Sequence, residues 1–130
     1  MTNIMDKFGA LPEFCSLTGV SEEQIASAEI ALERRFADDY REYLAHMGIA
    51  TANGHEFTGI CNSKRLNVVD VTLSERSIHP DIPQDWYVLE EANIDGIVIW
   101  QSSTGEIFQT QPGRETIKLA DSIGDYLDLP

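Results

Sequence analysis

The sequence predicts a single α+β domain, in which helices flank an antiparallel or mixed sheet of about four to six strands. Two observations support this prediction. Helical apolar patterns fill the first part of the chain, and short β-rich segments separated by turn residues follow. The chain has 130 residues, which is enough for one domain with its own core and too few for two ordinary ones. We therefore assign residues 1–130 to one domain.

The segment 22–35 is predicted to form an amphipathic helix. Ser21 and Gln24 have the spacing of a capping box, in which each side chain accepts a hydrogen bond from the other residue's backbone N–H. Apolar residues recur on one face of the segment at Ile25, Ala28 and Leu32. Residues 1–19 are more weakly patterned and predict a short helix followed by a loop.

A second helix is predicted to begin at Asp38 and Asp39 and to stop at Gly48, a residue suited to a left-handed C-terminal position. Its apolar residues follow helical spacing at Tyr40, Tyr43, Leu44 and Met47. The two aspartates raise the possibility of acid–base chemistry. Adjacent helical residues point about 100° apart, however, and acids favour helix starts because they complement the dipole. We interpret the pair as structural.

The second half of the chain reads mainly as strands. Residues 56–60 form a short strand candidate, and 66–73 is ambiguous, because its β-branched residues favour a strand while its apolar spacing also suits a helix. Four strands are predicted at 86–89, 97–100, 106–110 and 115–119, with turns at 93–96, 103–105 and 112–113. A last short helix is predicted to be capped by Asp121 or Ser122.

The charge of the chain is strongly negative. It carries 22 Asp and Glu against nine Lys and Arg, for a net charge of −13. Such a charge repels nucleic acids and anionic membrane surfaces and attracts cationic partners, so neither direct nucleic-acid binding nor membrane binding is expected. Two interpretations remain open: the charge serves solubility alone, or it forms an acidic face for a basic protein.

The sequence contains no pattern typical of catalysis or metal binding. His55, His79 and Cys61 would support an enzyme or a metal site only if folding brought them together, because their spacing matches no ligand motif. We therefore predict a protein without catalytic residues, metal or cofactor. We also expect Cys15 and Cys61 to be free thiols in a cytoplasmic protein, since neither a signal peptide nor a membrane span is recognisable.

Several segments together resemble the SUKH superfamily, which includes bacterial immunity proteins and fungal cell-wall-assembly regulators. Ile25-x3-Glu29-x2-Leu32, then 36–44 and Met47-Gly48, are similar to its opening signature, with Phe36-Ala37 in place of Leu-Pro and Tyr43 in place of Phe. Residues 67–76, 87–97 and 122–127 are similar to its later segments, in the same order. The resemblance places the core of the domain at 21–128.

This resemblance implies a SUKH-like α+β fold, with a helix at 67–77 and no catalytic residues. It further implies an immunity protein that binds and neutralises a cognate toxin, often a nuclease. The net charge of −13 adds the expectation that this toxin domain is basic. The alternative is a regulatory or scaffold protein of the cell-wall-assembly type. We predict that the partner contacts Trp86 and the acidic residues on the loops and strand ends around it, namely Asp81, Asp85, Glu90, Glu91 and Asp95. Two alternatives stay open for Trp86: it is exposed, or it is a partly buried loop residue.

Overall fold

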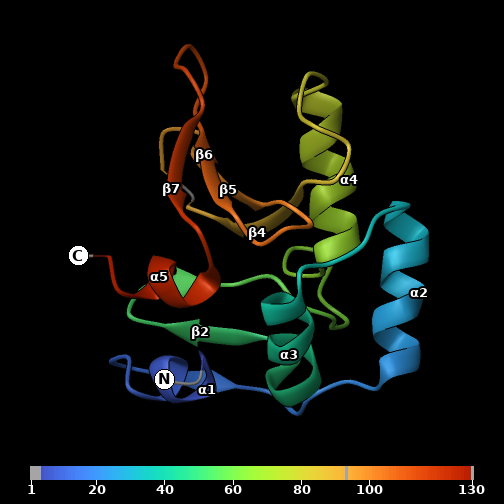
Figure 1. Ribbon diagram of the computed structural model, residues 1–130, viewed down its shortest axis with the longest axis vertical. Coiled ribbons are helices and arrows are strands. Elements are labelled where there is room, and N and C mark those ends of the chain that lie inside the picture. Colours follow the sequence, from blue (N-terminus) through green and yellow to red (C-terminus); the bar gives the residue numbers. More distant parts are fainter. Residues whose placement is uncertain (1–3, 93, 130) are drawn as a thin grey trace.

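The computed structural model of the protein describes residues 4–92 and 94–129 and has an α+β fold with two antiparallel sheets (Figure 1). The predicted α+β class is confirmed. The elements in chain order are α1 (Ile4–Gly9), β1 (Cys15–Ser16), α2 (Glu22–Leu32), α3 (Asp38–Met47), β2 (Ala50–Ala52), β3 (His55–Glu56), α4 (Val68–Ile78), β4 (Tyr87–Glu91), β5 (Val98–Gln101), β6 (Ile107–Thr110), β7 (Ile117–Ala120) and α5 (Ile123–Leu127).

The predicted capping box is present at the start of α2. Ser21 Oγ accepts a hydrogen bond from the backbone N–H of Gln24 at 3.2 Å, and Gln24 Oε1 accepts one from the backbone N–H of Ser21 at 3.1 Å. The helix ends at Leu32 rather than at the predicted residue 35, because the next residue adopts a left-handed conformation with a φ of 56°. Arg34 therefore lies beyond the helix, where its guanidinium donates to the backbone carbonyl of Trp86.

Helix α3 has the predicted bounds and stops at Gly48, whose φ is +67°. The Asp39 side chain does more than begin the helix. Its carboxylate accepts hydrogen bonds from the backbone N–H of Ile123 at 2.8 Å and from Gln101 Nε2 at 2.9 Å. Asp39 thereby holds α3 against the start of α5 and against β5.

The ambiguous segment 66–73 lies largely in α4, so the helix implied by the family resemblance is confirmed. Asn67 caps the helix by accepting a hydrogen bond from the backbone N–H of Val69 at 3.0 Å. Thr72 is fully buried and its Oγ1 accepts a hydrogen bond from the backbone N–H of Val88 at 3.0 Å. The cap and this contact with β4 outweigh the β-propensity of the segment.

The strands are divided between two sheets, a division that the sequence did not indicate. Strands β4 to β7 form the predicted antiparallel meander, while β1, β2 and β3 form a smaller sheet. The predicted strand at 56–60 is reduced to the end of β3 and two isolated bridges, Phe57 with Glu90 and Gly59 with Asn67, and the first of these links the two sheets. Beyond it, Gly59 packs so closely that a Cβ there would lie 1.9 Å from the carbonyl oxygen of Gly48.

Between β4 and β5, Asp95 and Gly96 both have positive φ, as a tight turn requires. The predicted turn at 93–96 also includes Asn93, which lies outside the described residues.

The centre of the core is a cluster of buried aromatic rings, which we call the tyrosine cluster: Phe36, Tyr40, Tyr43 and Tyr87. Its ring centroids lie 4.8 to 5.4 Å apart. Tyr43 OH donates to the carbonyl of Thr58 and accepts from the backbone N–H of Ala50, both at 2.9 Å. The other two hydroxyls are also hydrogen-bonded, and burial raises the pKa of all three tyrosines.

A second apolar cluster covers the opposite face of the four-stranded sheet and includes Trp86. Of the two alternatives for this tryptophan, exposed or partly buried, the exposed one is wrong: Trp86 is only 9% exposed and stacks on Phe108 with ring centroids 4.1 Å apart. The preceding residue explains its position. The carboxylate of Asp85 accepts hydrogen bonds from the backbone N–H and the hydroxyl of Ser103, so the loop is tied to the β5–β6 turn. The other tryptophan, Trp100, is fully buried in the same cluster.

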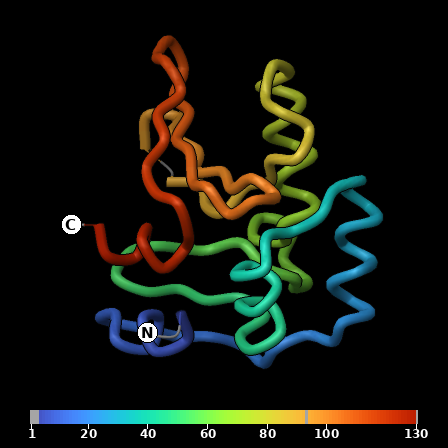
Figure 2. Tube along the Cα trace, viewed as in Figure 1, coloured from blue at the N-terminus to red at the C-terminus, as the bar shows by residue number. Residues whose placement is uncertain are grey.

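The two ends of the described chain meet in the fold. Helices α1 and α5 contact each other, and Lys7 Nζ donates to the carbonyl of Gly124 and to the carboxylate of Asp128. Phe8 is fully buried, although it lies outside the residues 21–128 to which the resemblance assigned the core. The trace in Figure 2 shows the β6–β7 hairpin and the C-terminal end of α4 projecting in the same direction.

Candidate partner-binding cleft

The residues predicted to contact a partner do not share one surface. Asp81 and Trp86 line a cleft between the α4–β4 loop and the β6–β7 hairpin. Glu90 and Glu91, at the end of β4, line a different cleft of about 300 Å³. Asp95 is exposed in the β4–β5 turn. Asp85, hydrogen-bonded to Ser103 of the β5–β6 turn, lines neither cleft. The structure therefore brings together two pairs of the six.

A β-bulge in β4 determines how Glu90 is oriented. Val88 pairs with Trp100 but Glu90 pairs with Ile99, so two residues of β4 oppose one residue of β5. Since paired residues share a face, Glu90 lies on the same face as Ile99, which belongs to the main core. Strict alternation from Val88 would have turned Glu90 toward the tryptophan side.

Glu90 forms the centre of a polar network at this face. The side chain is only 3% exposed. Its two carboxylate oxygens lie 2.9 and 3.0 Å from His55 Nδ1, and Tyr126 OH donates to Oε2 at 2.5 Å. The His55 ring also stacks on Phe57, with centroids 5.6 Å apart. One buried carboxylate thus joins β3, β4 and α5.

The electrostatics follow from these contacts. The hydrogen bond to Glu90 raises the pKa of His55, although burial opposes the shift. Burial, together with the nearby Glu90 charge, raises the pKa of Tyr126 well above its ordinary value. Tyr126 is therefore a neutral donor, and Glu90 favours the protonated form of His55.

Two further carboxylates line the same cleft and differ in how they are balanced. Glu56 makes a two-point ion pair with Arg65, at 3.0 and 2.8 Å, which lowers the pKa of Glu56. Burial, followed by a hydrogen bond and like-charge repulsion from Glu75 of α4, raises the pKa of Glu91 to about 7. The charged form of Glu91 is consequently disfavoured in this site. We call the site formed by His55, Glu56, Glu90, Glu91 and Tyr126 the carboxylate cleft.

The polar side chains that line the cleft carry carboxyl, imidazole, phenol and amide groups. Of the described residues that line it, none is Ser, Thr, Cys or Lys, so the Tyr126 hydroxyl, the imidazole and the carboxyl groups are the nucleophile types present there. The three residues on which a predicted enzyme site would depend, His55, His79 and Cys61, make separate contacts. His79 packs edge-on against Trp100, while Cys61 contacts the carbonyl of Ser63. Within 4–92 and 94–129, no group of three or more His, Cys, Asp or Glu is arranged to hold a metal ion.

Sequence reasoning missed three residues of this region. His55 was considered only as a metal or catalytic residue, and neither Tyr126 nor Glu75 was assigned to a site. The bulge that turns Glu90 toward His55 leaves no recognisable signal in the sequence. The adjacent acids at 90 and 91 were the one available indication of a charged site.

Comparison with known proteins establishes the family. The chain matches the family model SUKH_5, described as SMI1-KNR4 cell-wall, over residues 1–128. The comparison with curated proteins gave no match. None of the helices in the described part of the chain has the length and apolar character needed to span a bilayer. The match covers nearly the whole chain and agrees with the helix and strand order, so the chain belongs to the SUKH superfamily.

Proposed function

We propose that the protein is a non-catalytic immunity protein, which acts in the cytoplasm by binding and neutralising a cognate toxin with a basic surface. The observation that carries the proposal is membership of a superfamily that includes toxin-immunity proteins, in a chain with a net charge of −13. A basic nuclease domain grips phosphates with lysines and arginines. An acidic protein competes for the same groups and associates quickly by electrostatic steering.

The carboxylate cleft is our candidate for the centre of the contact. Glu91 and Glu75 repel each other, and burial disfavours the charged form of Glu91. A lysine or arginine of the partner placed at Glu91 would relieve both effects. Glu90, held by His55 and Tyr126, would lie behind it as a fixed negative charge.

The proposal is tested by co-expressing the protein with the toxin-like product of a neighbouring gene and measuring growth and complex formation. We expect protection from growth arrest and a complex whose association slows when added salt shortens the screening length from about 10 Å to about 3 Å. Persistent growth arrest, with no complex for any candidate toxin, would contradict it.

A matched pair of variants tests the cleft itself. At pH 8, above the pKa of about 7 for Glu91, Glu91→Gln removes most of one charge in the cleft, and Glu115→Gln removes one charge in the exposed segment between β6 and β7. We expect the first to weaken toxin binding about tenfold and the second to change it less than twofold. Equal effects would show that only overall charge matters.

The regulatory or scaffold role is retained as a second candidate because the matched family is described by a cell-wall term. In that case no neighbouring toxin gene would be found, and deletion of the gene would alter wall integrity with no toxin present.

A further inference from the structure

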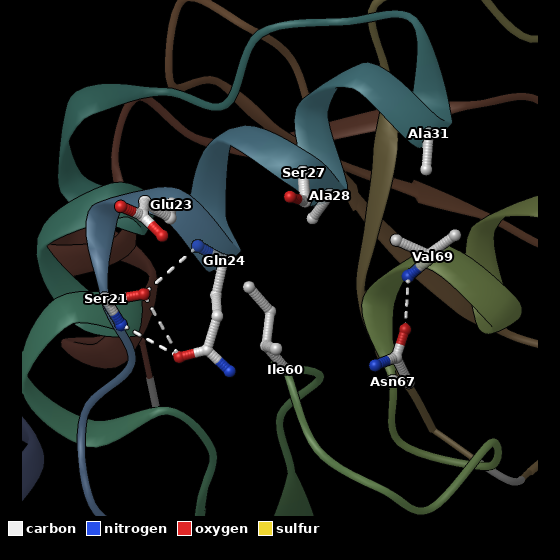
Figure 3. Close-up of a pocket in the computed structure, with 9 residues that line it drawn as sticks. All are labelled: Ser21, Glu23, Gln24, Ser27, Ala28, Ala31, Ile60, Asn67 and Val69. Carbon is white, nitrogen blue, oxygen red and sulfur yellow. Dashed lines mark hydrogen bonds between the residues drawn. The ribbon is translucent and has the colours of Figure 1, made fainter.

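A groove of about 460 Å³ lies between α2 and α4, away from the carboxylate cleft (Figure 3). Four apolar side chains line it: Ala28, Ala31, Ile60 and Val69. Figure 3 shows Ile60 and Val69 directed toward α2. The polar side chains at its ends are largely engaged in capping: Ser21 and Gln24 cap α2, and Asn67 caps α4. The groove therefore presents a mainly apolar surface.

Large exposed apolar residues extend this surface along both helices. Ile30 is 76% exposed and lies three residues after Ser27, which lines the groove. Leu73 is 52% exposed and lies four residues after Val69. Helical spacing places each on the same face as its lining neighbour. Two parallel rows of apolar and small residues, separated by a groove, form a surface suited to the apolar face of a third helix.

The charges on this surface select a cationic occupant. Glu23 is the one charged residue among the described residues that line the groove. Glu22, next to Glu23 in sequence, and Asp70, next to Val69, are both exposed. Arg34, which follows the end of α2, and Arg76, within α4, donate to backbone carbonyls. A second copy of the chain would bring another net charge of −13 to this face and would be repelled.

We propose that the α2–α4 groove binds an amphipathic α-helix of a basic partner. The apolar face of that helix packs on Ala31 and Val69, and a lysine or arginine pairs with Glu23. The proposal rests on the proposed function for the source of the helix, namely a basic partner protein. The small side chains of Ala28 and Ala31 allow a close approach of the helix backbone.

The test uses the whole chain and a synthetic probe, so it does not depend on a toxin. The probe is a fluorescent amphipathic leucine–lysine helix of about 18 residues, or five turns. Two control peptides accompany it: a scrambled one with its leucines spread around the helix, and one with glutamate in place of lysine. We expect the probe to bind by fluorescence anisotropy and both control peptides to bind at least tenfold more weakly.

Matched variants locate the binding site. Ala31→Arg fills the groove, whereas Ala26→Arg makes the same change at an exposed α2 position outside it. Both exchange one good helix former for another, and equal thermal unfolding checks the fold. We expect the first to weaken probe binding at least tenfold and the second less than twofold. Glu23→Gln should weaken binding about threefold and Glu22→Gln should leave it unchanged.

Equal weakening by Ala31→Arg and Ala26→Arg, or equal binding of the control peptides, would reduce the effect to general charge attraction and overturn the proposal. A dimer in sedimentation experiments that Ala31→Arg dissociates would assign the groove to a second copy and overturn it as well. Failure to protect against a toxin would contradict the proposed function but not this inference, since the probe replaces the toxin.

Discussion

The tyrosine cluster and the carboxylate cleft both bury hydrogen-bonded polar groups, but only one of them buries charge. In the cluster, neutral hydroxyls such as that of Tyr43 satisfy backbone groups inside the core. In the cleft, a carboxylate nearly as buried is held by a histidine and a tyrosine near the surface. A neutral network stabilises the fold regardless of pH near neutrality, whereas a charged one responds to pH and to a charged partner.

The largest expected loss of stability comes from a substitution in the tyrosine cluster, the neutral network of the two. Tyr43→Phe leaves the carbonyl of Thr58 and the N–H of Ala50 without their partner, so we expect a loss of about 2–3 kcal/mol in the free energy of unfolding. Urea unfolding measures the loss, which should be equal at pH 6 and pH 8. Tyr126→Phe is the matched control and should cost about 1 kcal/mol, because its hydroxyl is less deeply buried. A larger loss for Tyr126→Phe would reverse the comparison.

The next effect concerns the charge itself. Glu90→Gln keeps the shape of the side chain but removes the charged acceptor of His55 and Tyr126, and should destabilise the protein by about 1–2 kcal/mol at pH 6. Urea unfolding measures this loss. Proton NMR of the His55 ring should show its pKa falling toward the ordinary value of 6.5. Glu115→Gln, an exposed control, should change neither quantity, and an unaltered His55 pKa in Glu90→Gln would refute the assigned cause.

A stabilising substitution is expected within the cleft. The pKa of Glu91 is about 7 in the folded protein against an ordinary value of 4.5, so the folded state binds this proton more tightly and stability falls as pH rises between these values. Above pH 7, Glu91→Gln should therefore stabilise the protein by about 1 kcal/mol, a figure reduced for partial solvent screening. Near pH 4 it should have no effect. Unfolding midpoints across this range provide the measurement, and destabilisation at pH 8 would contradict the assignment.

The smallest effect is the pH dependence of the His55–Glu90 contact. Because the pKa of His55 is raised above 6.5, its stabilisation is fully present below that value and is lost as pH rises through the raised folded value. The unfolding free energy of the wild type minus that of His55→Gln should therefore decrease from pH 6 to pH 8. Placing Glu90→Gln in both backgrounds should abolish the decrease; if it persists, another group is responsible.

The fold was more predictable than the site, for physical reasons that particular residues illustrate. The capping box at Ser21 and the stop at Gly48 are local, so a few neighbouring residues determine them. The segment 66–73 was ambiguous because its helix depends on a contact between Thr72 and a strand distant in sequence. The burial of Trp86 depends on Asp85 reaching Ser103, which no local pattern indicates.

The candidate site depended almost wholly on such distant contacts. His55, Glu90 and Tyr126 come from three separate elements, and sequence patterns describe each one only within its own element. Charge clustering identified Glu90 and Glu91 as acids near a surface. The β4 bulge turns Glu90 toward the core side, and Glu75 lies close enough to Glu91 to raise its pKa. Neither the bulge nor the proximity of Glu75 could be derived from residue spacing.

The extra residue in β4 also bears on how such a domain can diversify. Since two residues of β4 oppose one of β5, Leu89 reaches the core and Glu90 the cleft on the same side of the sheet. Gain of a single codon is enough to create this arrangement, and β5 need not change. A lineage can thus add or lose an inward acidic group at the strand end while its neighbouring strands keep their pairing, so variation in partner preference need not disturb the scaffold.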